Sequence, residues 1–233
     1  MTKAEADKKT NDMTIPDKDK MKLEAAKAAM KYVEKGKIIG IGTGSTANHF
    51  IKLLGEISED IPGAVASSES SAILLEEVGI KVVSLNEVDE LYLYVDGADE
   101  CDGSLHLIKG GGGALTREKI VAQKAEKFIC VCDESKLVET LGAFPLPVEV
   151  IPMAEKLVTD IISQWGLKAE KRKDFITDNG NIILDIADIA IVEPVTMEEE
   201  FNQIPGVVTV GLFALRGADV LILGMADGVK IFD

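Results

Sequence analysis

Aromatic residues, cysteines and histidines are all scarce in this chain of 233 residues. Aromatic side chains make up 5% of the sequence and hydrophobic residues 46%, so the core must consist mainly of Val, Ile, Leu and Ala, as is usual in α/β proteins. Cys130 and Cys132 share one face of a predicted strand and lack neighbours that would complete a zinc shell. We therefore expect buried core cysteines, structural roles for His49 and His106, and no metal site.

No basic run offsets the excess of acidic side chains. The chain has 40 Asp and Glu against 25 Lys and Arg, a formal net charge of −15 at pH 7. This charge disfavours binding to the phosphate backbone of nucleic acids and to acidic membrane surfaces. The sequence also lacks an apolar stretch of the roughly 18 residues that span a bilayer, and its polar start, MTKAEADKKTND, lacks the apolar region of a signal peptide. We expect a cytoplasmic protein that binds neither nucleic acid nor membrane.

Short apolar strands alternate with helices over residues 21–132. This alternation predicts an α/β protein with a Rossmann-like, mostly parallel sheet that is covered on both faces. The expected helices are 21–34, 45–54, 70–78 and 116–125, and the expected strands are 37–42, 64–66, 81–83, 91–95, 105–109 and 128–132. Ligands of such sheets bind beyond the carboxyl ends of the strands, so the loops that follow the strands are the places to look for a site.

The regular alternation of strands and helices ends near Phe144, where the segment FPLPVEVIP carries three prolines. Helical patterns at 153–164 and 197–203 and strand-like patterns at 169–172 and 182–186 then predict a second, smaller α+β domain. The final VLILGMADGVKIF predicts a hairpin that turns at 226–228 and returns to the first domain. We expect a polar N-terminal extension at 1–20 and a Rossmann-like catalytic domain formed by 21–142 together with 214–233. The remaining residues, 143–213, are expected to form a small α+β domain.

The loop GIGTGSTA, residues 40–47, follows the first predicted strand. It matches neither the dinucleotide motif G-x-G-x-x-G, because Ser45 replaces the last glycine, nor the ATP-binding motif G-x-x-x-x-G-K-[ST]. A glycine turn that opens a helix, with the hydroxyls of Ser45 and Thr46, is suited to bind one phosphate through helix amides and the helix dipole. The alternative is that Ser45 only caps the helix.

The loop DGADECDG, residues 96–103, carries Asp96 and Asp99 three positions apart. Their carboxylates could both face one small polar ligand. Three interpretations stay open at this point, namely magnesium ligands, acceptors for sugar hydroxyls, and turn formers without a ligand.

The loop KGGGGALTREK, residues 109–119, holds four consecutive glycines. Such a run costs conformational entropy unless a ligand approaches the backbone or the chain needs positive φ. Lys109 supplies a cation, Thr116 is the expected N-cap of a helix, and Glu118 falls in its first turn. A glutamate in this position could be present only because its charge complements the helix dipole. The dipole is also expected to lower the pKa of Glu118, which favours the ionised form that a general base needs.

Together the three loops offer a phosphate site, two carboxylates, a lysine and a glutamate. Proton transfer next to a carbonyl requires a carboxylate base, a cation near the carbonyl oxygen and an anchor for the substrate. The combination therefore favours cofactor-free isomerisation of a small phosphorylated polyol.

The same residues resemble a known family, the type A ribose-5-phosphate isomerases. GTGSTA (42–47), DGADE (96–100), KGGGGALTREK (109–119) and DESK (133–136) match the motifs of that family in order and spacing, as do IPGVV, GLFALRGADV and DGVK near the end. One departure is Val210, which stands before GLF where the family usually has Asn or His. The resemblance implies interconversion of D-ribose 5-phosphate and D-ribulose 5-phosphate through a cis-enediol(ate), in the non-oxidative pentose phosphate pathway.

The resemblance also implies roles for individual residues. Glu118 would be the base, Asp96 would assist ring opening, and Asp99 and Lys109 would hold hydroxyls and the developing oxyanion. The residues that would bind substrate are Thr43, Gly44, Ser45, Thr46, Asp96, Gly97, Ala98, Asp99, Lys109, Gly110, Gly111, Gly112 and Lys136. The resemblance further implies that the enzyme needs no metal or cofactor and that it forms a homodimer or homotetramer.

Two alternatives stay open. A non-catalytic sugar-phosphate sensor of the same architecture would keep the phosphate site and lose the base, so the presence of Glu118, Asp96 and Lys109 together argues against it. An isomerase that prefers a different aldose phosphate would carry the same loops.

Overall fold

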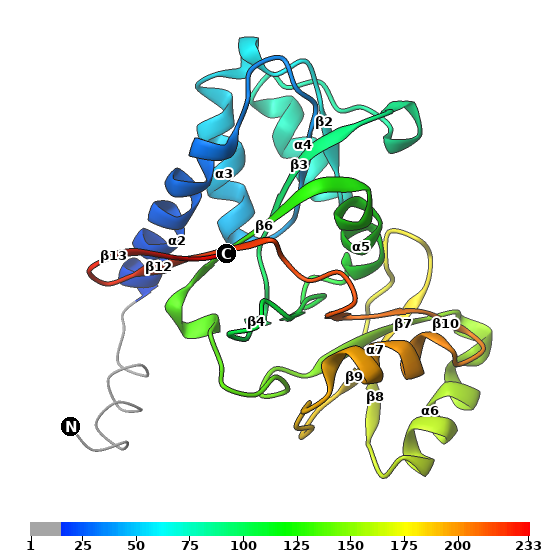
Figure 1. Ribbon diagram of the computed structural model, residues 1–233. Coiled ribbons are helices and arrows are strands. Elements are labelled where there is room, and N and C mark those ends of the chain that lie inside the picture. The colour runs from blue at the N-terminus through cyan, green and yellow to red at the C-terminus, as the bar shows by residue number, and fades with distance from the viewer. Residues whose placement is uncertain (1–14) are drawn as a thin grey trace.

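The computed structural model describes residues 15–233 of the chain (Figure 1). Helix α2 (Ile15–Ala29) begins before the predicted helix start at Met21, so it includes residues 15–20 of the predicted extension. The sequence before Met21 is mostly polar and gave no helical pattern, whereas from Met21 on buried apolar side chains recur at helical spacing. The remainder of the predicted extension, residues 1–14, lies outside the described residues.

A six-stranded sheet forms the larger layer of the molecule, in the order β13-β12-β6-β3-β1-β2. Its members are β1 (Ile39–Ile41), β2 (Ala64–Ala66), β3 (Leu91–Asp96), β6 (Ala125–Asp133), β12 (Val220–Met225) and β13 (Gly228–Phe232). All neighbours are parallel except the final hairpin of β12 and β13. The predicted fold class is confirmed, and so is the return of the chain's end to this sheet.

Helices cover both faces of this sheet. One face packs against α2, α3 (Ser45–Gly55) and α4 (Glu69–Glu77) through a core of Ala, Ile, Leu and Val with one buried Phe. The other face packs against α5 (Leu115–Lys124), and the core on that side contains the three cysteines. Cys130 and Cys132 place their sulfur atoms 3.5 Å apart in that core, so the prediction of buried cysteines on one strand face is confirmed.

Two predicted strands of the parallel sheet are wrong. Residues 81–83 make only an isolated bridge, at Val82, because β2 is short and at the sheet's edge. The strand predicted at 105–109 is only Leu107–Ile108, because Leu105 has positive φ and the Asp102 carboxylate holds the preceding turn. This strand, β5, is antiparallel in a separate small sheet with β4 (Glu100–Cys101) and β11 (Leu212–Phe213).

The second part of the chain forms a four-stranded antiparallel sheet in the order β10-β7-β9-β8. It contains β7 (Leu146–Val150), β8 (Ala169–Lys171), β9 (Ile182–Ile186) and β10 (Val207–Val210), with helices α6 (Glu155–Gln164) and α7 (Pro194–Asn202). Val210, the departure from the family pattern, is fully buried in the core of this sheet, opposite Val148. We propose the division into 21–142 with 214–233 and 143–213 as the domain structure.

Short 3-10 helices complete the structure at Met30–Tyr32, Ser58–Asp60, Leu85–Glu87, Glu134–Lys136 and Pro152–Ala154. No helix in residues 15–233 is both long enough and apolar enough to cross a membrane.

Candidate active site

The loop between β1 and α3 opens a helix without a side-chain cap. Gly44, with φ at 99°, takes the N-cap position, and Ser45 is the first helical residue. The alternative that Ser45 caps the helix is therefore wrong. The Ser45 side chain is exposed and, with Thr46, lines a cavity, so hydroxyls and the amides of the first helical turn lie together at the positive end of the helix dipole.

Asp96 ends β3 and is fully buried. One carboxylate oxygen accepts the amides of Thr43 at 3.0 Å and Gly97 at 2.7 Å. The other accepts the hydroxyl of Tyr94 and contacts the Lys109 ammonium at 2.8 Å. A Cβ atom on Gly42 would overlap this carboxylate, so glycine is needed there. Both oxygens are occupied, and Asp96 lies behind the cavity wall, outside its lining.

Lys109 lies between two carboxylates and is 2% exposed. Its Nζ lies 2.8 Å from Asp96, 3.2 Å from Glu118 and 2.6 Å from the carbonyl oxygen of Gly97. Burial alone would lower the pKa of the ammonium, but the two carboxylates outweigh burial and raise the pKa of Lys109 above its ordinary value. Lys109 therefore stays a cation that faces the cavity.

Glu118 lies in the first turn of α5 and is 2% exposed. Burial raises its pKa to about 8, the nearby Asp96 charge adds to this, and Lys109 opposes it. The predicted lowering of the Glu118 pKa by the helix dipole is wrong, because desolvation of a fully buried carboxylate outweighs the dipole. The Oε2 atom lies 3.2 Å from the Lys109 ammonium and has no other polar partner within the described chain, so it can accept a further contact from a ligand.

The glycine loop packs tightly between Asp99 and the small domain. Gly110 and Gly113 have φ of 107° and 82°, which meets the predicted need for positive φ. The amide of Gly111 donates to Asp99 at 2.7 Å. The predicted N-cap Thr116 is wrong, since α5 begins at Leu115 and the Thr116 hydroxyl instead donates to the carboxylate of Glu149.

These loops surround one cavity of about 490 Å³. The structure brings together twelve of the predicted site residues in its lining, namely Thr43, Gly44, Ser45, Thr46, Gly97, Ala98, Asp99, Lys109, Gly110, Gly112, Glu118 and Lys136. Asp96 and Gly111 are in contact with this set but lie outside the lining.

The cavity also contains residues that sequence reasoning missed. These are Lys22, Asn48, Ser68, Ser70, Leu74, Gly113, Ala114, Cys132, Asp133, Phe175 and Asp178. Lys22 comes from α2, next to the residues assigned to the extension. Phe175 and Asp178 come from the loop between β8 and β9, where the turn-forming stretch TDNG was the available signal.

Residues 15–233 contain no group of three or more His, Cys, Asp or Glu side chains placed to hold a metal ion. Asp96 in particular uses both oxygens for hydrogen bonds and the ion pair with Lys109. The interpretation of Asp96 and Asp99 as a magnesium pair therefore has no support in the geometry.

Comparison with known proteins identifies the family of this chain. The model of the family ribose 5-phosphate isomerase A (phosphoriboisomerase A) matches residues 63–228. The ribose 5-phosphate isomerase A of Neisseria gonorrhoeae is 49% identical with a TM-score of 0.90, and the match covers 92% of this chain and 96% of that one.

Two other solved structures are similar over nearly their whole length. A D-ribose-5-phosphate isomerase in complex with phospho-erythronic acid is 45% identical with a TM-score of 0.88, covering 93% of this chain and 99% of that one. The ribose 5-phosphate isomerase A of Methanocaldococcus jannaschii is 41% identical with a TM-score of 0.87, covering 92% and 98%. This chain therefore belongs to the ribose 5-phosphate isomerase A family.

Proposed function

We propose that Glu118 is the base with which this chain, a ribose-5-phosphate isomerase of the pentose phosphate pathway, interconverts D-ribose 5-phosphate and D-ribulose 5-phosphate. The observation that carries the assignment is the pairing of two buried, opposite charges at the cavity, Glu118 and Lys109, 3.2 Å apart. The Glu118 oxygen that faces Lys109 has no other polar partner in the described chain, and Lys109 stays a cation.

The reaction needs one proton to move from carbon 2 to carbon 1 and one to move from oxygen 2 to oxygen 1. Ionised Glu118 removes the proton from carbon 2 of the open-chain aldose, and the electrons of the broken bond form a cis-enediolate. Lys109 stabilises the negative charge that develops on oxygen. The hydroxyl proton on oxygen 2 moves to oxygen 1 of the enediolate, and Glu118 returns the carbon-bound proton to carbon 1. This gives the ketose and restores the carboxylate.

The phosphate group is assigned to the N-terminus of α3. The amides of its first turn and the hydroxyls of Ser45 and Thr46 form an anion site. Lys22 and Lys136 line the same cavity and add positive charge. One relative was solved in complex with phospho-erythronic acid, and we expect this chain to bind the same compound.

Asp96 and Asp99 have different roles in this proposal. Asp99 lines the cavity and is assigned to a sugar hydroxyl. Asp96 is fully buried behind Lys109, so we assign it to holding the ammonium in place rather than to opening the sugar ring.

The assembly and setting of the enzyme belong to the same proposal. The family resemblance supports a homodimer or homotetramer that works in the cytoplasm without a metal or cofactor.

A coupled assay on ribose 5-phosphate with the purified chain tests this function, with other aldose phosphates as competing substrates. Glu118→Gln keeps the size of the side chain and removes the base, so turnover is expected to fall by at least about 1,000-fold. Binding of phospho-erythronic acid is expected to persist.

The matched control is Glu77→Gln, an exposed glutamate at the end of α4. This variant should keep normal turnover. Near-normal turnover of Glu118→Gln would show that the base is a different residue.

A further inference from the structure

The loop between β8 and β9, residues 172–181, reaches from the small domain to the cavity and supplies two of its lining residues. The Phe175 ring packs so closely on Gly113 that a Cβ atom there would overlap it, and Asp178 lines the cavity beside it. Neither residue touches the buried charges of Glu118 and Lys109 through any hydrogen bond or ion pair. The question is therefore what holds this loop against the site.

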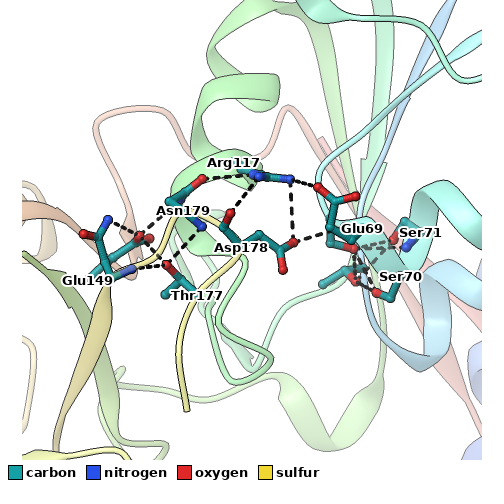
Figure 2. Close-up of polar contacts among 11 residues, drawn as sticks. Glu69, Ser70, Ser71, Arg117, Glu149, Thr177, Asp178 and Asn179 are labelled. Atoms are coloured by element: carbon teal, nitrogen blue, oxygen red, sulfur yellow. Dashed lines mark hydrogen bonds and ion pairs between the residues drawn. The ribbon is translucent and has the colours of Figure 1, made fainter.

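Glu149 on β7 anchors the loop from within the small domain (Figure 2). This carboxylate is fully buried, and one oxygen accepts Thr177 Oγ1 at 2.8 Å, Asn179 Nδ2 at 3.1 Å and Asn181 Nδ2 at 2.8 Å. Its other oxygen accepts the hydroxyl of Thr116, in the first turn of α5. One buried carboxylate thus binds both the loop and the helix that carries the base.

Arg117 binds the same loop from the catalytic domain (Figure 2). Its Nε donates to Asn179 Oδ1 at 3.0 Å and its Nη2 to the carbonyl oxygen of Asp178 at 3.0 Å. Its Nη1 donates to Glu69 Oε1 at 2.7 Å and lies 3.7 Å from Asp178 Oδ2. All three guanidinium nitrogens are used, and a planar fork of this kind fixes geometry in a way that a lysine does not.

The third member of this cluster is the N-terminus of α4. The Asp178 carboxylate accepts the backbone amide of Glu69 at 3.1 Å. Ser68 caps the same helix and contacts Thr43 through hydroxyl oxygens 2.9 Å apart. Ser68 and Thr43 both line the cavity. The loop, α4 and the phosphate-side wall are therefore joined through Asp178 and Arg117.

We propose that Arg117 is a positioning residue, which latches the loop 172–181 over the substrate cavity and fixes the helical turn that carries Glu118. Arg117 and Thr116 directly precede Glu118, and both are bound to the loop or to its anchor Glu149. A displaced first turn would move the Glu118 carboxylate relative to Lys109 and to the carbon acid. This inference rests on the proposed role of Glu118.

Arg117→Gln tests the latch, because it removes the charge and the fork while keeping a polar side chain. Misplacement by about 1 Å costs roughly 100-fold in rate, so kcat is expected to fall about 10- to 100-fold with little change in KM. Binding of inorganic phosphate, measured by calorimetry, should change little, because the hydrogen bonds of Arg117 go to Asn179, Asp178 and Glu69 and none goes to α3. Arg117→Lys should restore only part of kcat, since it restores the charge and not the fork.

A second variant guards against a general loss of folding. Glu69→Gln weakens only the α4 side of the latch at a residue whose side chain is 69% exposed. Its kcat should fall less than that of Arg117→Gln, and the double variant should lose less than the product of the two single losses. The matched control is Lys171→Gln, which breaks an exposed ion pair with Glu155 beside the loop and should leave kcat unchanged.

The outcomes separate the latch from the function on which it rests. A wild-type chain without isomerase activity would overturn the proposed function. An active wild type with an inactive Glu118→Gln variant, but normal kcat in folded Arg117→Gln, would overturn the latch alone. Equal kcat in Arg117→Lys and Arg117→Gln with a lowered Tm in both would also overturn it, because the effect would then be one of stability.

Discussion

At the scale of single residues, the chemistry of this site depends on three buried charged side chains. Asp96 and Glu118 flank Lys109, so that with Glu118 ionised the trio carries one net negative charge in a volume with almost no exposure to water. Burial of that extra charge is what raises the pKa of Glu118. The residue types were predictable from the motifs, whereas the direction of the pKa shift was not, because it depends on burial by segments distant in the sequence.

The raised pKa of Glu118 predicts a distinct pH dependence of catalysis. Only ionised Glu118 accepts a proton from carbon, so kcat/KM for ribose 5-phosphate should rise with pH and level off above about pH 8. Initial rates from about pH 5 to 9, at constant ionic strength, measure this. A plateau that already begins at about pH 5 would contradict the assigned environment of Glu118.

Three elements contribute residues to the site in addition to the loops 40–47, 96–103 and 109–119 that the sequence motifs identified. Helix α2 brings Lys22, helix α4 brings Ser68 and Ser70 near its N-terminus, and the β8–β9 loop closes one wall. The motif loops were predictable because each follows a strand pattern in the sequence. The other contributions depend on how helices and the second sheet pack against the first, which local periodicity does not encode.

Lys22 on α2 is expected to bind the substrate phosphate, and this role can be tested by substitution. If it holds the substrate phosphate with α3, Lys22→Gln should raise KM for ribose 5-phosphate by roughly 10-fold, the loss of one charge-assisted hydrogen bond, with kcat little changed. Lys20→Gln, an exposed lysine of the same helix outside the cavity lining, is the control and should leave KM unchanged. Steady-state kinetics of the two variants would contradict the assignment if both had the wild-type KM.

At the scale of the whole molecule, the acidic excess lies in two segments of the chain, one of which contains the loop expected to bind the sugar. The segment 82–108 carries seven acids and the segment 174–215 carries eight, with no Lys or Arg in either, and 7 + 8 accounts for the net charge of −15. An anionic substrate is still accommodated, because its phosphate is assigned to helix amides and lysines and only its hydroxyls to carboxylates. The overall class of fold was predictable from the alternation of strands and helices.

The stability of the whole molecule should respond to Glu118 as well. The folded-state pKa of Glu118, about 8, exceeds its ordinary value of 4.5, so protonated Glu118 stabilises the fold at low pH and this contribution is lost as pH rises through 8. Glu118→Gln removes that loss. The free energy of unfolding of Glu118→Gln, relative to that of the wild type, should therefore increase by about 1.4 kcal/mol for each pH unit between about pH 4.5 and pH 8.

Urea unfolding of both proteins at about pH 5.5 and 7.5 measures the gain, expected at roughly 2 kcal/mol. An equal difference in unfolding free energy at the two pH values would mean that Glu118 has an ordinary pKa.

The central claim, that Glu118 carries the proton between carbons 1 and 2, is tested most directly by isotope exchange. Ribose 5-phosphate is incubated in D₂O with the wild type or with Glu118→Gln, and deuterium at these carbons is followed by NMR. The wild type should isomerise the sugar and incorporate deuterium from solvent, because the carboxylate exchanges its proton, and the variant should do neither. Isomerisation with deuterium incorporation by the folded variant at the wild-type rate would contradict the claim.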